Sequence, residues 1–204
     1  MNWPFSSKPT LTTFQLGNQR LAAKDYAAAT ELFLAHAEEI PDDAATAFAK
    51  VAECYRRSNA LPRPEVVAPG ITLVSQGDLA SAEYYYRLAL ERDPRHFSSL
   101  KGLADVLPEQ SDERVRCMEQ AVDLQPDTVM LTEIGDFYRR RDPSRAYGFY
   151  VKAQAHNPKD PTAYDRLQAV CRELGRNDEA EEWAKRWDAA YATKRRVDGR
   201  AGRG

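Results

Sequence analysis

Residues 131–158 read LTEIGDFYRRRDPSRAYGFYVKAQAHNP, and this stretch decides the fold of the 204-residue chain. Two runs of apolar residues at helical spacing flank Asp142-Pro143, where the carboxylate can cap a helix that starts with proline. Pro158 follows the second run and ends it, because proline lacks the amide hydrogen that a helix interior needs. The stretch therefore predicts two antiparallel helices joined by a short turn.

Small and aromatic residues of these two helices are placed for close packing. Ala146, Tyr150 and Ala153 follow one another at offsets of four and three, so they share one helical face. Small residues at a helix crossing let the two backbones approach, and an aromatic ring fills the space beside the crossing. The pair Ile134-Gly135 supplies an apolar and a small residue on the first helix. We therefore expect the ring and the small residues to form the contact between the helices.

The same pattern recurs along the chain with constant internal offsets. Four apolar helical runs end at a proline, namely Pro41, Pro94, Pro126 and Pro158. Twelve residues before these prolines stand Ala29, Ala82, Arg114 and Ala146. A fifth unit places Ala180 at the corresponding position. A recurring helix pair of this kind indicates a repeat protein.

These units resemble the tetratricopeptide repeat (TPR) family, which carries a W-x2-L-G-x2-Y, then A-x3-F, then P pattern. The best match consists of Leu131, Ile134, Gly135, Tyr138, Ala146, Tyr150 and Pro158. The resemblance covers about residues 10–195 and implies an all-α, right-handed α-solenoid of about five helix-turn-helix repeats with a terminal capping helix. Arg114 stands where the family has alanine, so we expect altered packing in the third repeat.

The repeats, with the irregular parts around them, give a predicted domain organisation. We expect an N-terminal lead over residues 1–9, a solenoid over 10–193 and a basic, disordered tail over 194–204. The predicted repeats span about 10–42, 43–95, 96–127, 128–159 and 160–193. Trp187 stands where the preceding repeats have alanine, and a side chain of that size is typical of a terminal capping helix.

The second repeat is too long, and alignment places the surplus at residues 59–76, between its two helices. Three prolines and a glycine make a long helix there improbable. Four apolar residues of this insertion are candidate contacts, namely Val66, Val67, Ile71 and Leu73. They can pack back on the solenoid, contact a partner as a hook, or belong to a disordered loop, and the sequence leaves these alternatives open.

Charge and composition exclude several classes of function. Lys and Arg total 29 against 31 Asp and Glu, so the net charge of −2 gives no support for nucleic-acid or membrane binding by the whole chain. The basic residues of 194–204 leave RNA contact open for the tail alone. No apolar run is long enough to span a bilayer, and no export signal is recognisable. With three cysteines and no disulfide framework, we expect a cytoplasmic protein.

No pattern in the sequence indicates catalysis. His36, His96 and His156 are too far apart in the chain to share one metal or relay a proton, and no metal-ligand, nucleophile or phosphate-loop motif occurs. The three cysteines lie in amphipathic helices, where a buried structural thiol is the expected role. We therefore predict that the chain is not an enzyme and needs no cofactor.

With catalysis set aside, molecular recognition is the predicted class of function. The resemblance implies a protein-interaction adaptor or scaffold that binds a peptide or partner subunit in a concave groove. The groove is lined in that family by the first helix of each repeat. Carried over position by position, the candidates are Asn18, Lys50, Glu53, Arg56, Arg57, Lys101, Asp105, Asp136, Arg139, Arg140, Arg166 and Arg172.

Arginine forks hold carboxylates, so an acidic or amphipathic extended segment is the preferred ligand. Mutual ion pairs on an ordinary solvated face are the competing interpretation. The resemblance also leaves a chaperone for a secretion or complex subunit, and an RNA-associated accessory protein, as alternative functions. Homo-oligomerisation is possible through exposed aromatic residues, for which the candidates are Tyr84, Phe149, Trp183 and Tyr191.

Overall fold

The structure is a computed structural model that describes residues 11–58 and 78–201, with side chains through residue 189. The described residues form ten α-helices and one short 3-10 helix and contain no strand. They divide into two compact units, residues 1–109 and 110–204. The division falls between the two helices of the third predicted repeat, whereas the sequence alone suggested one continuous solenoid.

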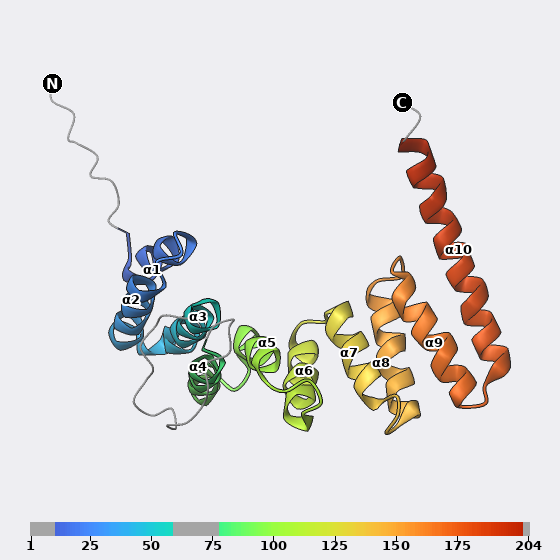
Figure 1. Cartoon of the computed structure of the whole chain (residues 1–204), viewed down its shortest axis with the longest axis horizontal. Coiled ribbons are helices and arrows are strands. Elements are labelled where there is room, and N and C mark those ends of the chain that lie inside the picture. The colour runs from blue at the N-terminus through green and yellow to red at the C-terminus, as the bar shows by residue number, and fades with distance from the viewer. Residues whose placement is uncertain (1–10, 59–77, 202–204) are drawn as a thin grey trace. The chain divides into compact units, whose positions relative to one another are not determined.

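Unit 1 consists of two helix pairs and a fifth helix (Figure 1). Its helices are α1 (Thr13–Ala22), α2 (Tyr26–Glu39), α3 (Ala44–Arg57), α4 (Leu79–Arg92) and α5 (Phe97–Val106), with a 3-10 turn at Pro41–Asp43. Short side chains cap the N-termini of helices in this unit. Thr12 forms a capping box with Gln15 on α1, and the Asp78 carboxylate accepts the backbone N–H of Ser81 on α4.

The core of unit 1 depends on rings that press against glycines. Phe33 is fully buried, and a Cβ atom at Gly17 would lie 2.7 Å from its ring. Tyr86 contacts Gly102 of α5 in the same way, since a Cβ there would lie 2.2 Å from the phenol ring. Only glycine permits this approach between helix backbones.

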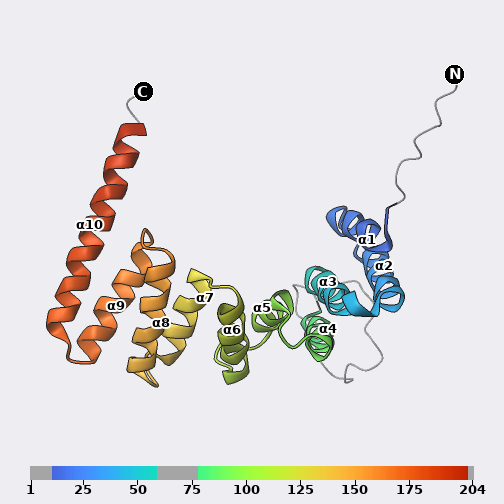
Figure 2. The same cartoon turned by 180° about the vertical axis from the view of Figure 1, so that it is seen from behind.

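Unit 2 contains α6 (Asp112–Leu124), α7 (Thr128–Tyr138), α8 (Pro143–His156), α9 (Pro161–Glu173) and α10 (Asn177–Ala201). Each of the first four has a side-chain cap at its N-terminus, from Ser111, Asp127, Asp142 and Asp160. Neighbouring helices from α7 to α10 pack side by side, as Figures 1 and 2 show. The Asp-Pro starts of α8 and α9 are those expected from the sequence.

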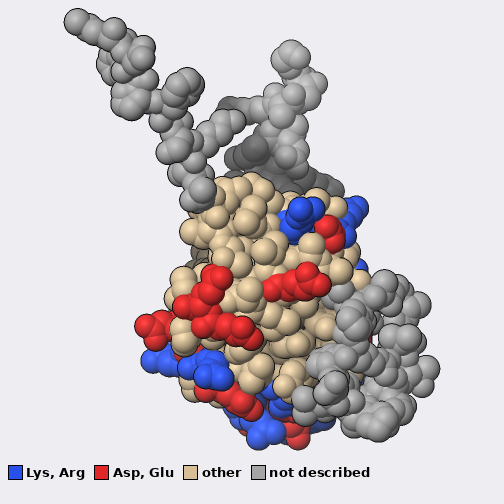
Figure 3. Space-filling view, turned by 90° about the vertical axis from the view of Figure 1, so that its left-hand side faces the viewer, with Lys and Arg blue, Asp and Glu red and all other residues tan. Residues whose placement is uncertain are grey.

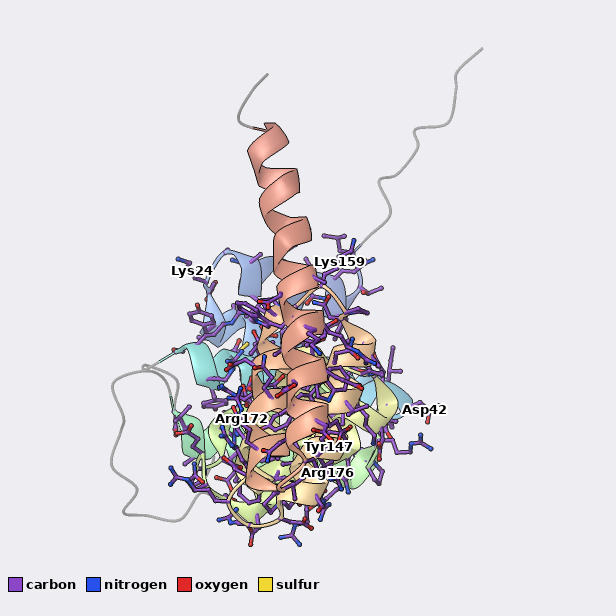
Figure 4. All side chains as sticks on the ribbon, turned by 90° about the vertical axis from the view of Figure 1, so that its right-hand side faces the viewer. Lys24, Asp42, Tyr147, Lys159, Arg172 and Arg176 are labelled. Atoms are coloured by element: carbon purple, nitrogen blue, oxygen red, sulfur yellow. The ribbon has the colours of Figure 1, made fainter. Side chains whose placement is uncertain are left out.

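Tyr150 and Leu167 are fully buried in the core of unit 2, and the Trp183 side chain is 7% exposed beside them. The Trp187 side chain is partly buried against this cluster. Near the start of α10, the Arg176 guanidinium lies 5.2 Å from the centre of the Tyr147 ring, and Figure 4 shows the two side chains next to each other. Aromatic packing therefore joins α8, α9 and α10.

Two predictions about the C-terminal part of the chain are wrong. The chain is helical through Ala201, so the segment 194–204 is not disordered as a whole; lysine, arginine and alanine propagate a helix, and no proline interrupts this one. Trp183 is buried in the core, with its ring tilted against that of Tyr164 at a centroid distance of 6.0 Å, so it is not an exposed docking residue. The predicted lead 1–9 and insertion 59–76 lie outside the described residues.

Arg114 shows what replaces the expected alanine in the third repeat. Its guanidinium lies 2.6 Å from the carboxylate of Glu133 on α7, and the Arg114 side chain is only 17% exposed. An ion pair between helices thus takes the place of a small-residue contact. The altered packing expected from the sequence at this position is present.

The three cysteines have the structural role that their helical context predicted. Cys54, Cys117 and Cys171 are all buried as free thiols. Burial raises the pKa of Cys54 to about 11, so the thiolate that a nucleophile requires is scarce at neutral pH.

A buried histidine ties α2 to the turn that follows it. His36 is 4% exposed and packs against Phe14, and its Nε2 lies 2.9 Å from the Asp43 carboxylate. Burial alone would raise the pKa of Asp43, but hydrogen bonds from His36 and Thr46 outweigh burial and lower it.

The close approach of α7 and α8 can be tested with a pair of glycine variants. A Cβ at Gly135 would lie 2.3 Å from the buried Tyr150 ring, so Gly135→Ala should lower the free energy of unfolding by about 1 to 3 kcal/mol. Gly148 has open space around it on α8, so Gly148→Ala should raise the free energy of unfolding by about 0.5 to 1 kcal/mol. Urea denaturation measures both, and equal effects of the two changes would contradict the packing described.

The Asp43 carboxylate should make the free energy of unfolding depend on pH in the acid range. Because its folded-state pKa is lowered, its contribution is complete well above the ordinary value of 3.8 and is lost as the pH falls through the folded-state pKa. The difference in unfolding free energy between wild type and Asp43→Asn should therefore be largest near neutral pH and shrink below 3.8. Denaturant melts across this range measure it. A difference that stays the same from neutral pH to below 3.8 would contradict this role of Asp43.

Candidate partner-binding surfaces

A pocket of about 250 Å³ opens in unit 1 between α3 and α5. Five of the predicted groove residues line it, namely Lys50, Glu53, Arg56, Lys101 and Asp105. The first three belong to α3 and the other two to α5, because the first helices of consecutive repeats face the same side. The structure therefore brings together residues that lie up to 55 positions apart in the chain.

We call this pocket the α3–α5 pocket. A buried phenol ring, packed against a glycine, forms its floor. Tyr86 reaches it from α4 and lies against Gly102. Burial raises the pKa of the Tyr86 hydroxyl, while the charge of Arg56 and its hydrogen bond act in the opposite direction. The Nε atom of Arg56 is buried and has no hydrogen-bond acceptor among the described residues. A buried N–H without an acceptor is costly, and an anionic ligand would satisfy it.

Some charges of the pocket neutralise one another. The Glu53 carboxylate lies 3.0 Å from the Lys50 ammonium and 2.6 Å from the Arg57 guanidinium. These pairs at spacings of three and four follow the interpretation of mutual ion pairs on one helix. Arg57 is exposed and does not line the pocket.

The other lining residues were not predicted as groove residues, and they include Thr46, His96 and Phe97. Thr46 precedes the predicted part of α3, and His96 and Phe97 stand at the start of α5. The Nδ1 of His96 lies 2.7 Å from the Ser99 hydroxyl, and burial lowers the pKa of His96. His96 and Phe97 follow Pro94 closely, at the start of the next helix. This position in the sequence is the signal that could have revealed them.

In unit 2 two of the four predicted arginines, Arg139 and Arg166, are paired with the chain's own carboxylates. Arg139, directly after α7, donates to Glu173 on α9 through its Nε at 2.9 Å and a terminal nitrogen at 2.5 Å. Asp136 accepts the Tyr150 hydroxyl at 2.7 Å and lies 2.8 Å from the Arg166 Nε. Burial is the largest cause that raises the pKa of Tyr150, and the hydrogen bond to Asp136 raises it further. This network joins α7, α8 and α9, so its first role is structural.

The other predicted residues lie apart from these groups. Asn18 is half-buried on α1 and does not line the α3–α5 pocket, while Arg140 and Arg172 are exposed in unit 2. The insertion residues Val66, Val67, Ile71 and Leu73 lie outside the described residues. In the view of Figure 3, acidic and basic side chains lie next to one another in small mixed groups among uncharged residues.

A metal site and a membrane-spanning helix are both absent from residues 11–58 and 78–201. Within these ranges no group of three or more histidine, cysteine or acidic side chains is placed to hold a metal ion. The described helices also include none with the length and apolar character that a membrane crossing demands.

Comparison with solved structures shows the fold. One crystal structure of MamA superposes with a TM-score of 0.63 at 14% identity, covering 90% of this chain and 92% of that one. MamA 41-end from Desulfovibrio magneticus RS-1 gives 0.60 at 15% identity over 91% and 95%. YrrB, described as a TPR protein with an unusual peptide-binding site, gives 0.60 at 15% identity over 87% and 84%. The chain has the tetratricopeptide repeat fold.

The TPR fold confirms the predicted all-α class of helix-turn-helix repeats. No protein-family model and no curated protein matches the sequence. Arg114 is one position at which this chain departs from the repeat pattern. The fold tolerates such changes, since packing sets few positions strictly.

The structural role of the Arg139–Glu173 pair can be measured. A double-mutant cycle with Arg139→Gln and Glu173→Gln should give a coupling energy of about 0.5 to 1 kcal/mol, because the pair is bidentate but partly exposed. The coupling should fall as salt is added. A coupling of zero at low salt would leave Arg139 available for a ligand and contradict the role assigned to it.

Proposed function

We propose that the chain is a non-catalytic protein-interaction adaptor that binds an extended acidic or amphipathic segment of a partner in the α3–α5 pocket. The observation that carries the proposal is the buried Arg56 Nε, which has no acceptor within the described residues although it lies in a pocket lined by predicted groove residues. A carboxylate of the partner would supply that acceptor.

The composition of the pocket supports a peptide over a compact charged ligand. Lys50, Arg56 and Lys101 face two carboxylates, so the lining has a small excess of positive charge. Phe97 and the ring of Tyr86 add apolar surface beside the charges. A segment that alternates acidic and apolar side chains would meet both features.

The comparisons add one supporting fact. YrrB, whose fold this chain shares, is described as having a peptide-binding site. At 15% identity the likeness concerns the fold, so the choice of pocket and ligand rests on the residues of this chain.

The chaperone and RNA-associated alternatives remain predictions. Contacts of the described side chains favour neither one. The predicted tail residues through Ala201 belong to α10. In the RNA-associated alternative, a helix and not a disordered segment would therefore contact the RNA.

The pocket can be tested with a defined peptide. We expect a fluorescein-labelled ten-residue peptide of alternating glutamate and leucine to bind the full chain, with affinity that falls as salt is raised. Arg56→Leu should weaken binding about tenfold or more, because a buried charged hydrogen bond is lost. Fluorescence anisotropy measures the affinity.

Matched variants make the result specific. Lys50→Glu combined with Lys101→Glu reverses charge at the rim and should also weaken binding, whereas Lys185→Glu on the exposed face of α10 should not. Circular dichroism checks that each variant is folded. Unchanged affinity in folded Arg56→Leu and in the rim variant would overturn the proposed site.

A further inference from the structure

A second pocket, in unit 2, is formed by residues that were not among the predicted groove residues. It lies where the end of α7 meets α6 and the start of α8, and it has a volume of about 490 Å³. Two aromatic rings and three guanidinium groups line it, from Phe137, Tyr138, Arg116, Arg141 and Arg145. We call it the arginine–aromatic pocket. It shares no residue with the α3–α5 pocket.

Stacking on rings holds two of these arginines. The Arg141 guanidinium lies 3.8 Å from the centre of the Phe137 ring, and that of Arg145 lies 4.1 Å from the centre of the Tyr138 ring. Tyr138 in turn stacks on Phe149 with an interplanar angle of 9°. Cation–π contacts limit the rotamers of an arginine, so its N–H groups are oriented before any ligand arrives.

The two acidic residues of the pocket are held differently. Glu119 lies 2.7 Å from Arg145 and also interacts with the Tyr138 hydroxyl, so its charge is compensated. Asp112 lies 3.6 Å from Arg141, and the Asp112 side chain is 79% exposed. A loose, exposed pair of this kind contributes little to stability. A ligand carboxylate can therefore replace Asp112 beside Arg141 at low cost.

Arg116 is the unsatisfied cation of this surface. It lies on α6, one helical turn from both Asp112 and Glu119, and its side chain is exposed. Within the described part of the chain it makes no ion pair or hydrogen bond. Three arginines thus face two carboxylates, of which one is firmly engaged.

We propose that the arginine–aromatic pocket binds a carboxylate side chain that stands next to an aromatic or apolar side chain in a protein partner. Arg116 and Arg141 would hold the carboxylate, and Phe137 and Tyr138 would contact the neighbouring apolar group. This second site makes the chain a two-site adaptor, and it does not depend on the α3–α5 pocket.

A peptide carboxylate fits this pocket better than a nucleic acid does. The chain's own Glu119 and Asp112 show that carboxylates are accommodated beside Arg145 and Arg141. These same two carboxylates would repel a run of phosphates, whereas a single carboxylate needs only one position between Arg116 and Arg141. The half-buried rings of Phe137 and Tyr138 beside it then favour an apolar neighbour.

The test uses the full chain with Lys50→Glu and Lys101→Glu, which we expect to weaken binding at the α3–α5 pocket. The probe is a fluorescein-labelled peptide containing two copies of Glu-Phe-Asp-Leu, compared with its amide counterpart Gln-Phe-Asn-Leu. We expect the acidic peptide to bind by anisotropy and the amide peptide to bind about tenfold more weakly or not at all.

Single changes localise the binding. Arg116→Ala and Arg141→Ala should each weaken it about tenfold, and Phe137→Leu, which keeps an apolar side chain, should weaken it by a smaller factor. The control is Arg186→Ala on α10, which removes an arginine stacked 4.6 Å from the Trp183 ring, outside the pocket. It should leave the affinity unchanged.

Three results would overturn this proposal. These are unchanged affinity in folded Arg116→Ala and Arg141→Ala, equal binding of the amide peptide, and stronger binding of single-stranded oligouridine than of the acidic peptide through the same arginines. Failure of this site and failure of the α3–α5 pocket are separable, because Arg56→Leu probes only the latter.

Discussion

The structure depends on one repeated contact, in which an aromatic ring lies directly against a glycine of a neighbouring helix. Phe33 on Gly17, Tyr86 on Gly102 and Tyr150 on Gly135 all place ring atoms where a Cβ would otherwise stand. Close approach of the backbones follows, and it fixes which faces of the helices remain available. Of these three rings, Tyr86 also lines the α3–α5 pocket.

The two units use the same helix faces differently. On α7 and α9 the arginines predicted to bind a ligand instead bind Glu173 and Asp136, so charge there holds helices together. On α3 and α5 a comparable set of residues encloses a pocket and leaves the Arg56 Nε without an acceptor among the described residues. Residue type alone therefore does not separate a binding arginine from a structural one, because both make the same hydrogen bonds.

The candidate surfaces also differ in how arginine is prepared for a partner. In the α3–α5 pocket burial orients Arg56, whereas in the arginine–aromatic pocket stacking on Phe137 orients Arg141. Both arrangements reduce the conformational entropy that binding would cost. An adaptor with two such surfaces gains avidity when one partner carries two suitable segments.

The sequence by itself determined the helices, their pairing and the TPR fold, because helical periodicity, Asp-Pro starts and proline stops are local signals. It also named five residues of the α3–α5 pocket. Tertiary structure alone decided that Arg139 meets Glu173, that Trp183 is buried, and that Arg116 and Arg141 share a pocket with Phe137. Such contacts join side chains from different helices, and their distances depend on how the helices pack, which no local pattern encodes.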